Sequence, residues 1–465
     1  MLPVSAQDRI EKDSLGEVRV AARALWGAQT QRALDNVRIG RARMPANLVH
    51  AIGLVKWAAA ETNGELGELP APLAAAISAA ALEVVEGRHD GHFPLGVMQT
   101  GSGTSTHMNV NEVVARLATE RLGERVHPND HVNRGQSSND VIPTALHVAA
   151  ALAVRNDLLP ALGQLESAIG ARAEAARGQV KVGRTHLMDA LPVTVGQEMG
   201  AWRSQVSDAA ARIEAARVRL HRLALGGTAV GTGVNAHPGF AARAIARLAS
   251  RTGIGFVAAP DRFAVMAGQD AAVELSAALR GAAVVLLKVA NDLRWMNSGP
   301  LAGLGEISLP ALQPGSSIMP AKVNPVIPEA VAMAATQVMA HDAAVGMAGA
   351  SGNFQLNVML PLIAHALDES IALVADSANA LAARVIPGLV VHAGRISESL
   401  ARNPMLLTAL APRIGYDRAA RIAQRAAAES RPIVDVAVEE TCLPREELGR
   451  LLDPARLVRG DDRDP

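Results

Sequence analysis

Residues 195–223 read VGQEMGAWRSQVSDAAARIEAARVRLHRL, and the spacing of their apolar side chains decides how this chain folds. Apolar residues recur at alternating intervals of four and three, at Val195, Met199, Trp202, Val206, Ala209, Ile213, Ala216, Leu220 and Leu223. This heptad-like spacing predicts one amphipathic helix on the order of 40 Å long, because each helical residue adds about 1.5 Å.

The same spacing returns later in the chain, at Leu275, Leu279, Ala282, Leu286, Val289 and Leu293, and Ser298-Gly299-Pro300 then predicts a helix end. Two further long helices are predicted over 328–345 and 361–384, and shorter ones over 45–63 and 71–86. Long helices with such seams pack side by side in a bundle. Because one chain leaves long apolar faces to cover, we expect oligomerisation through the bundle. Short charged helices are predicted after Val390, with a disordered tail over 459–465.

Composition narrows the classes of protein to consider. Hydrophobic residues make up 49% of the 465 residues but aromatic residues only 2%, so alanine, leucine and valine must pack the core. The formal net charge of zero argues against a nucleic-acid binder and a polybasic membrane anchor. Cys442 is the only cysteine, which indicates a reducing compartment. With no signal peptide and no uncharged apolar run of membrane-spanning length, we expect a soluble, cytoplasmic protein without nucleic-acid or membrane partners.

Residues 315–325, GSSIMPAKVNP, form the most informative polar segment. Prolines make a regular helix or strand improbable here, and glycine permits backbone N–H groups to converge on an anion. Only five of the 45 basic residues are lysines, so Lys322 stands out as a compact point charge among arginines. Such a charge can stabilise a serine alkoxide or a negative charge that develops in a transition state.

Four further polar segments interrupt the helices. The hydroxyl-rich stretch 99–112 leads into a helix N-terminus, where free N–H groups favour anions. The stretch 137–140 is typical of a helix N-cap. The stretch 226–235, GGTAVGTGVN, is not a dinucleotide fingerprint, because no strand–helix–strand pattern surrounds it. In the stretch 183–190, His186 with a carboxylate such as Glu329 would make a general base near neutral pH.

Two histidines four residues apart, His127 and His131, raise the question of a metal site. Pro128 and Asn129 prevent both from sharing one helix face, and no cysteine or second histidine pair accompanies them. A turn with capping side chains is therefore the expected structure, and no metal or other cofactor is predicted.

Together these segments identify a family resemblance. The chain resembles the fumarase/aspartase superfamily, most closely the iron-free class II fumarases, from EKDSLG at 11–16 to NPMLLTAL at 403–410. The motifs that carry the resemblance are GSSIMPAKVNP at 315–325, GSGTS at 101–105, HPND at 127–130, QSSND at 136–140 and GRTHLMDA at 183–190.

The resemblance implies a mainly α, three-domain fold. Its parts would be a mixed helical domain at 1–136, a central bundle of long helices at 137–393 and a small helical domain at 394–465. The long helices of four chains would form a twenty-helix core in a homotetramer. Each active site would combine segments of three chains, and isolated monomers would be inactive.

The implied activity is the reversible hydration of fumarate to L-malate, by carbanion-type anti elimination and addition without a cofactor. Ser316 would be the base, His186 paired with Glu329 the partner acid/base acting through a water, and Lys322 the cation. The residues expected to bind the substrate carboxylates are Ser102, Gly103, Thr104, Ser137, Ser138, Asn139, Thr185, Ser317, Lys322, Val323 and Asn324. A secondary dicarboxylate site would consist of His127, Pro128, Asn129 and Asp130.

Several positions depart from the family pattern, and two other functions stay open. His107 and His131 stand where fumarases often have Asn and Asp, Glu124 where some have an arginine, and Ala321 where the signature has glycine. The alternative enzyme is an aspartate ammonia-lyase, which shares the fold and the carbanion chemistry. A structural protein without activity is the alternative of a different class, and the intact Ser316, His186 and Lys322 argue against it.

Overall fold

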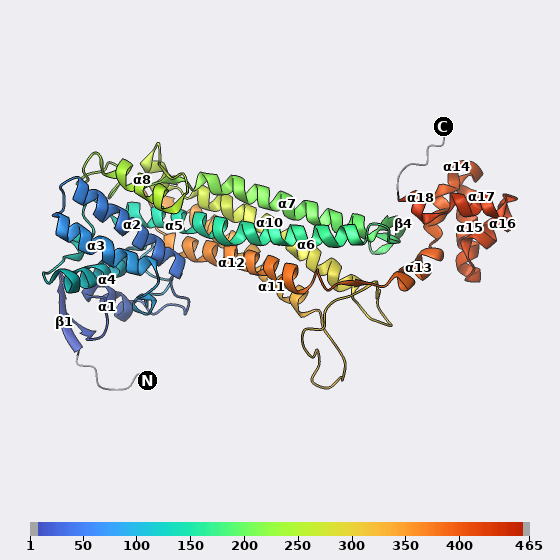
Figure 1. Cartoon of the computed structure of the whole chain (residues 1–465), viewed down its shortest axis with the longest axis horizontal. Coiled ribbons are helices and arrows are strands. Elements are labelled where there is room, and N and C mark those ends of the chain that lie inside the picture. Colours follow the sequence, from blue (N-terminus) through green and yellow to red (C-terminus); the bar gives the residue numbers. More distant parts are fainter. Residues whose placement is uncertain (1–7, 459–465) are drawn as a thin grey trace. The chain divides into compact units, whose positions relative to one another are not determined.

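The computed structural model describes residues 8–458 and is mainly α-helical, as predicted (Figure 1). The described helices are α1 (Ala28–Asn36), α2 (Ala46–Glu65), α3 (Ala71–Val85), α4 (Thr104–Leu122), α5 (Ser138–Ala153), α6 (Leu159–Ala175), α7 (Val195–Arg219), α8 (Phe240–Thr252), α9 (Arg262–Ala267), α10 (Asp270–Met296), α11 (Val326–Gly349), α12 (Leu360–Arg384), α13 (Ala393–Ala401), α14 (Ala411–Ile414), α15 (Tyr416–Glu429), α16 (Ile433–Thr441), α17 (Arg445–Leu451) and α18 (Pro454–Leu457).

The chain divides into two compact units. The first holds the described residues up to Pro160 together with Ala209–Ala283 and Ala334–Ala375. The second holds Ala161–Asp208, Val284–Met333 and the described residues from Asp376 onward. The division into three domains at 136 and 393 stays a prediction.

Strands are short and pair two at a time. In the first unit, the pairs are β1 (Asp8–Asp13) with β2 (Gly16–Ala21), β5 (Arg222–Leu223) with β6 (Val257–Ala258) and β8 (Gly352–Asn353) with β9 (Leu356–Asn357). In the second unit, they are β3 (Val180–Thr185) with β4 (Met188–Thr194) and β7 (Ile307–Ser308) with β10 (Val390–Val391). All pairs are antiparallel except β5 with β6, and none of them builds a larger sheet among the described residues.

The seam predicted from residues 195–223 is confirmed as a buried stripe. All nine of its side chains are at most 2% exposed, and so are all six in the seam of α10. The prediction was wrong at one end, because α7 stops at Arg219. Leu223 instead belongs to β5, and backbone bonds from Val257 and Ala259 to residues 221 and 223 hold that segment extended. A pairing partner 35 residues away therefore overrides the local helical pattern.

The ends of the other long helices agree closely with the sequence. Helix α10 ends at Met296, just before the predicted stop at Ser298-Gly299-Pro300. Helix α11 extends the predicted 328–345 helix at both ends, to 326 and 349, and α12 begins one residue before the predicted 361. Proline near a helix start is tolerated, since the first N–H groups have no intrahelical acceptor.

Polar side chains also link neighbouring long helices. In the second unit, the indole N–H of Trp202 on α7 donates to Asp292 on α10 at 2.9 Å. In the first unit, Asp342 on α11 accepts from the hydroxyl of Ser276 at 2.8 Å and pairs with Arg280, both on α10, at 2.9 Å. Within each unit, the long helices therefore pack as neighbours, as the bundle prediction requires.

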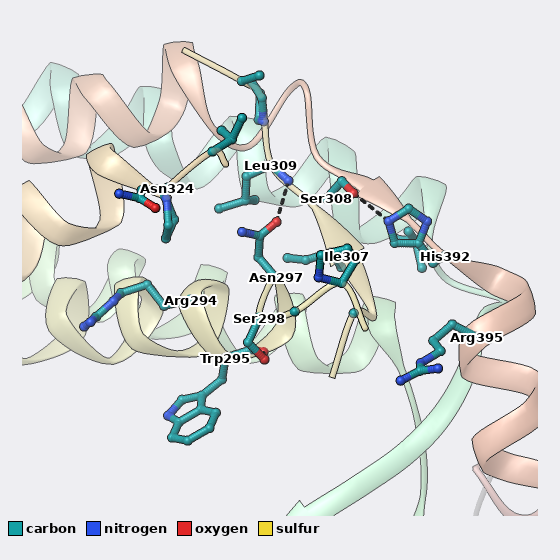
Figure 2. A pocket seen from close by; sticks show the side chains of 18 of the residues that line it. Arg294, Trp295, Asn297, Ser298, Ile307, Ser308, Leu309, Asn324, His392 and Arg395 are labelled. Atoms are coloured by element: carbon teal, nitrogen blue, oxygen red, sulfur yellow. Dashed lines mark hydrogen bonds between the residues drawn. The ribbon is translucent and has the colours of Figure 1, made fainter. Parts of the chain in front are cut away.

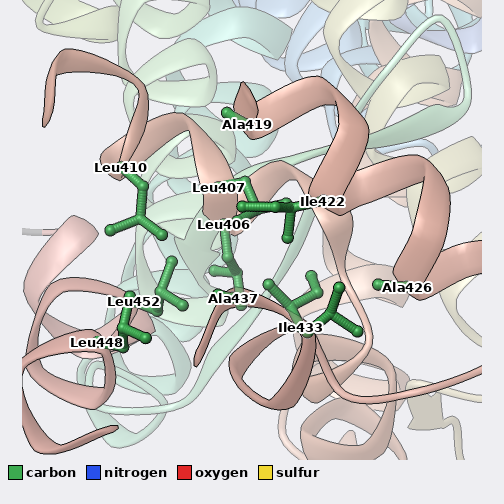
Figure 3. Packing of buried hydrophobic residues seen from close by; sticks show 11 residues of the cluster. Leu406, Leu407, Leu410, Ala419, Ile422, Ala426, Ile433, Ala437, Leu448 and Leu452 are labelled. Atoms are coloured by element: carbon green, nitrogen blue, oxygen red, sulfur yellow. The ribbon is translucent and has the colours of Figure 1, made fainter. Parts of the chain in front are cut away.

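The C-terminal residues form a separate small core within the second unit (Figure 3). Short helices α15, α16 and α17 pack around it, which confirms the short helices predicted after Val390. Its buried members are Leu406, Leu407, Leu410, Ala419, Ile422, Ala426, Ile433, Val436, Ala437, Leu448 and Leu452. The tail predicted to be disordered, 459–465, lies outside the described residues.

One continuous helical stretch, Ser138–Ala175, has the length and apolar composition that could cross a membrane. Its most apolar window is 67% buried within the protein. Buried core helices meet the same criterion, so length and composition alone do not make it a membrane span.

His147 on α5 gives the fold a predicted pH dependence. The ring is buried, its Nδ1–H donates to the backbone oxygen of Arg222 at 3.0 Å, and burial lowers the pKa to about 4 from 6.5. The unfolded chain takes up this proton at higher pH than the folded one, so the contribution to stability is complete above pH 6.5 and is lost as pH falls toward 4. We expect His147→Gln to reduce the loss of unfolding free energy over this interval by up to about 3 kcal/mol.

Urea unfolding at pH 7, 6, 5 and 4 gives the unfolding free energy as a function of pH for both proteins. A destabilisation that is the same at every pH would not change the slope of this profile, so a difference in slope reports the titration of His147. His237→Gln is the matched control, since His237 is exposed. Parallel pH profiles for wild type and His147→Gln would show that His147 does not titrate in this way.

Candidate active site

The loop at 315–325 is closed on itself at its base. The backbone N–H of Gly315 donates to the carbonyl of Lys322 at 2.8 Å, and the side-chain amide of Asn324 donates to the carbonyl of Gly315 at 2.8 Å. A Cβ at position 315 would lie 2.6 Å from the Lys322 oxygen, so only glycine fits there. Ala321 has φ +65°, the left-handed conformation that glycine adopts most readily, which explains physically why glycine suits that position of the signature.

Inside this loop, the hydroxyl oxygen of Ser316 accepts two backbone hydrogen bonds. The N–H of Ile318 lies 3.3 Å from it and the N–H of Met319 3.0 Å. Hydrogen bonds to the oxygen stabilise its ionised form more than its neutral form. The loop therefore supplies two hydrogen-bond donors that would stabilise an alkoxide at Ser316.

A cavity of about 1370 Å³ in the second unit borders this loop (Figure 2). It brings together four of the predicted site residues, Lys322, Val323, Asn324 and Glu329. Its lining also includes Asn297, whose side-chain oxygen accepts from the N–H of Leu309 at 2.9 Å. Ser308 and His392, which share a hydrogen bond of 2.6 Å, line it as well. These wall residues were missed in the sequence, where no motif marks them.

His186 and Thr185 lie at the tip of the β3–β4 hairpin. His186 and Leu187 both have positive φ, 55° and 62°, as a two-residue hairpin turn requires. Leu187 and Met188 are 69% and 70% exposed. The described residues contain no hydrogen bond or ion pair between His186 and Glu329, so that pairing stays a prediction for an assembled protein.

The base of this hairpin is held by a buried ionic cluster. Lys181 on β3 is 1% exposed and donates to Glu198 at 2.8 Å and to Glu306 at 2.6 Å. Arg184 adds a second ion pair to Glu306 at 2.7 Å. The cluster joins the hairpin to α7 and to the segment before β7, which fixes the hairpin's base within the second unit.

In the first unit, residues 101–104 form a tight turn into α4. The carbonyl of Gly101 accepts from the N–H of Leu360 at 3.0 Å, and a Cβ on Gly101 would lie 1.7 Å from the oxygen of Val358. The hydroxyls of Ser102 and Thr104 lie 2.8 Å apart at the helix N-terminus, with Gly103 between them at φ +73°. The predicted approach of this segment to a helix N-terminus is confirmed.

The segment 137–140 begins α5 with a capping box, also as predicted. Asp140 is fully buried and accepts 2.9 Å hydrogen bonds from the N–H groups of Ser137, Gly226 and Thr228. Burial raises the pKa of Asp140 to about 6, against the effect of these donors. The side-chain amide of Asn139 donates to the carbonyl of Ala229 at 2.8 Å. The stretch 226–235 thus serves to hold this N-terminus in place.

Two buried residues that sequence reasoning did not assign to the site lie directly behind it. His107 contacts the hydroxyl of Ser138 at 2.7 Å through Nδ1, and Lys56 contacts the other ring nitrogen at 2.5 Å. Both are 0% exposed. The sequence feature that could have pointed to this pair is Lys56, which is one of five lysines and the only charged residue within the apolar run 51–60.

The HPND segment forms a single π-helical turn, η2 (Pro128–Val132). The Nδ1 atom of His127 accepts from the N–H groups of Asn129 and Asp130, at 3.2 and 3.1 Å, which confirms the capping interpretation. His127, Pro128 and Asn129 border a cavity of about 490 Å³, with four basic side chains in its lining, those of Arg9, Lys12, Arg116 and Arg125. No metal-binding group of three or more His, Cys, Asp or Glu residues occurs over 8–458.

The predicted site residues therefore occupy both units of one chain. Positions 102–104, 137–139 and 127–130 belong to the first unit, and positions 185–186, 316–317, 322–324 and 329 to the second. Their union in one site stays a prediction.

Comparison with known proteins identifies closely similar chains. The family described as lyase matches residues 16–340, and the family described as fumarase C C-terminus matches 406–459. A fumarate hydratase class II of Xylella fastidiosa strain 9a5c is 57% identical, over 97% of this chain and 96% of its own length. The protein named fumarate hydratase class II 2 of Pseudomonas aeruginosa is 56% identical, over 97% of this chain and 99% of its own. The crystal structure of a class II fumarase from Schistosoma mansoni matches with a TM-score of 0.95 and 37% identity, covering 98% of this chain and 100% of that one.

Proposed function

This chain belongs to the class II fumarate hydratase family of lyases, and we propose that it catalyses the reversible hydration of fumarate to L-malate. The observation that supports this most directly is the loop at 315–325. It holds Ser316 with two N–H groups on its hydroxyl oxygen, and its Lys322 and Asn324 border a cavity large enough for a four-carbon diacid.

The chemistry follows from the charges that this reaction develops. Ser316, as an alkoxide, takes the proton from the carbon next to a carboxylate of L-malate, and the resulting aci-carboxylate carries one more negative charge than the substrate. Fixed donors and a cation lower the barrier only if they meet that charge as it develops. Lys322, Asn324 and the hydroxyls of the carboxylate-binding segments supply those groups. His186, paired with Glu329, provides the leaving hydroxyl with a proton through a water.

We further propose that the active site is assembled from three chains of a homotetramer in the cytoplasm, with the domains 1–136, 137–393 and 394–465. Two features support assembly. The predicted site residues are divided between two units of the chain, and apolar side chains next to them are exposed, with Leu187 at 69% and Ile318 at 84%. Large exposed apolar groups beside polar site residues mark surfaces that another chain can cover.

The test of the reaction is the ultraviolet absorbance of fumarate. With the purified protein and L-malate alone, absorbance should rise as fumarate forms. Starting from fumarate, absorbance should fall equally with and without ammonium, because water is the nucleophile. Consumption of fumarate only when ammonium is present would identify an aspartate ammonia-lyase instead. If the absorbance changed in none of these mixtures, a structural protein without activity would be the remaining candidate.

A further inference from the structure

A chain of buried hydrogen bonds reaches Ser138 from the interior of the first unit. Lys56 on α2 contacts Nε2 of His107 on α4 at 2.5 Å, and Nδ1 of the same ring contacts the hydroxyl of Ser138 at 2.7 Å. Lys56 and His107 are 0% exposed, and Ser138 is the first residue of α5. The roles proposed above for the loop at 315–325 do not involve Lys56 or His107.

The hydrogen-bond partners of Lys56 determine which way these bonds point. Its Nζ also lies 3.1 Å from the side-chain oxygen of Asn133 and 2.9 Å from that of Gln136. The amide nitrogens of both side chains are occupied elsewhere, Asn133 donating to the carbonyl of Gln136 and Gln136 donating to the carbonyl of Val132. Their oxygens therefore face Nζ, and an ammonium with three protons finds three acceptors, the third being Nε2 of His107.

Two opposing effects act on the charge of Lys56. Burial lowers the pKa of Lys56 well below its usual value, but the buried carboxylate of Asp140 acts in the opposite direction. A neutral amine would instead accept from the Nε2–H of His107, and Nδ1 would then accept from Ser138, whereas the ammonium donates to all three neighbours. Burial and the charge of Lys56 both lower the pKa of His107, so its ring is neutral and carries one proton.

With Lys56 as an ammonium, these contacts leave one arrangement of protons. Because Nε2 accepts from Lys56, the proton of the neutral ring must be on Nδ1. Nδ1–H then donates to the oxygen of Ser138, and the serine's own O–H cannot point back at the ring. It is directed away from His107, free to donate to an anion at the N-terminus of α5, where the backbone N–H groups also favour negative charge.

We propose that His107, fixed by Lys56, is a positioning residue that makes Ser138 a hydrogen-bond donor to a carboxylate of the substrate. The inference rests on the proposed function for the identity of that carboxylate, but the proton arrangement does not. It also gives a role to one departure from the family pattern, because an asparagine at position 107 could accept from Lys56 and donate to Ser138 with its two amide atoms.

Two variants, His107→Asn and His107→Asp, test the direction of the hydrogen bond between His107 and Ser138, because asparagine and aspartate have nearly the same shape. His107→Asn keeps a donor toward Ser138, so KM for L-malate should stay within about twofold of wild type. His107→Asp offers only acceptors, which turns the Ser138 O–H inward, and KM should rise about tenfold while kcat changes less than about twofold. Aspartate also keeps a hydrogen-bond acceptor for Lys56.

His107→Asp could also raise KM because its carboxylate repels a carboxylate of the substrate. Ser138→Ala, alone and combined with His107→Asp, separates this repulsion from the loss of the hydrogen bond that Ser138 donates. The single change should raise KM about tenfold, and the double variant should be no worse, because both remove the same hydrogen bond. Additive losses would overturn the proposal, and so would equal KM values for His107→Asn and His107→Asp. Circular dichroism and thermal midpoints identify any variant that fails to fold.

A measurement without turnover tests the proton arrangement separately. In protein labelled with ¹⁵N-histidine, the ring nitrogens that disappear in His107→Asn belong to His107, and their shifts should show a neutral ring protonated at Nδ1. A ring protonated at Nε2 would overturn the inference even if the enzyme is active. Absence of any activity on L-malate in the wild type would overturn the proposed function and leave this result standing.

Discussion

Replacing Ser316 with alanine should lower kcat for L-malate by at least about a hundredfold, without changing the helical content or the oligomeric state. The substitution removes the one hydroxyl whose oxygen accepts the N–H groups of both Ile318 and Met319, and with it the proposed base. The two backbone donors remain but have no oxygen to stabilise. Steady-state assay of fumarate formation, with circular dichroism and size-exclusion chromatography of the same preparation, measures the effect.

Ser317→Ala is the matched control, because it removes a neighbouring hydroxyl that is exposed on the same loop. Its proposed role is to bind a carboxylate, so KM should change more than kcat. A kcat within a few fold of wild type for Ser316→Ala would refute the assignment of Ser316 as the base.

Asp140→Ala should lower the free energy of unfolding by about 3–5 kcal/mol, the largest effect on stability that we expect from one side chain in this region. Its carboxylate is fully buried and accepts the N–H groups of Ser137, Gly226 and Thr228. Removing it leaves three donors without an acceptor and takes away the negative charge that acts to raise the pKa of the buried Lys56. Urea unfolding at pH 7.5, above the pKa of about 6, measures the loss with the carboxylate ionised.

Asp130→Ala is the control for this measurement. Asp130 lies in the neighbouring HPND segment, but its side chain is 76% exposed, so its removal should change the unfolding free energy by no more than about 0.5 kcal/mol. If Asp140→Ala were as mild as Asp130→Ala, the start of α5 would be held by its helical packing rather than by this carboxylate.

The scarcity of lysine marks more positions in this chain than Lys322. It singled out Lys322 because arginine is the usual cation of this chain. The structure shows that scarcity marks more than one kind of position. Lys56 and Lys181 are both buried in polar networks, one behind Ser138 and the other at the base of the His186 hairpin. A compact ammonium suits such interiors, since three acceptors can surround it closely.

The polar segments could be found in the sequence because their chemistry is local. Gly103 has a positive φ, Gly315 lies against the carbonyl of Lys322 in its own loop, and the Ser137–Asp140 capping box spans a single turn of α5. The contacts behind them could not be found this way. His107 and Ser138 are 31 residues apart, and Asp140 and Thr228 are 88 residues apart. No spacing rule connects residues that meet only when separate helices pack.

By itself, the sequence determined the helical class, the buried faces of the long helices and most of their ends, because a period of 3.6 residues and the stop signals act over one or two turns. The tertiary structure alone decided that α7 ends at Arg219, since the backbone beyond it pairs with β6. It also brought His107 between Lys56 and Ser138, and the bond direction that we propose depends on these neighbours, which come from distant parts of the chain.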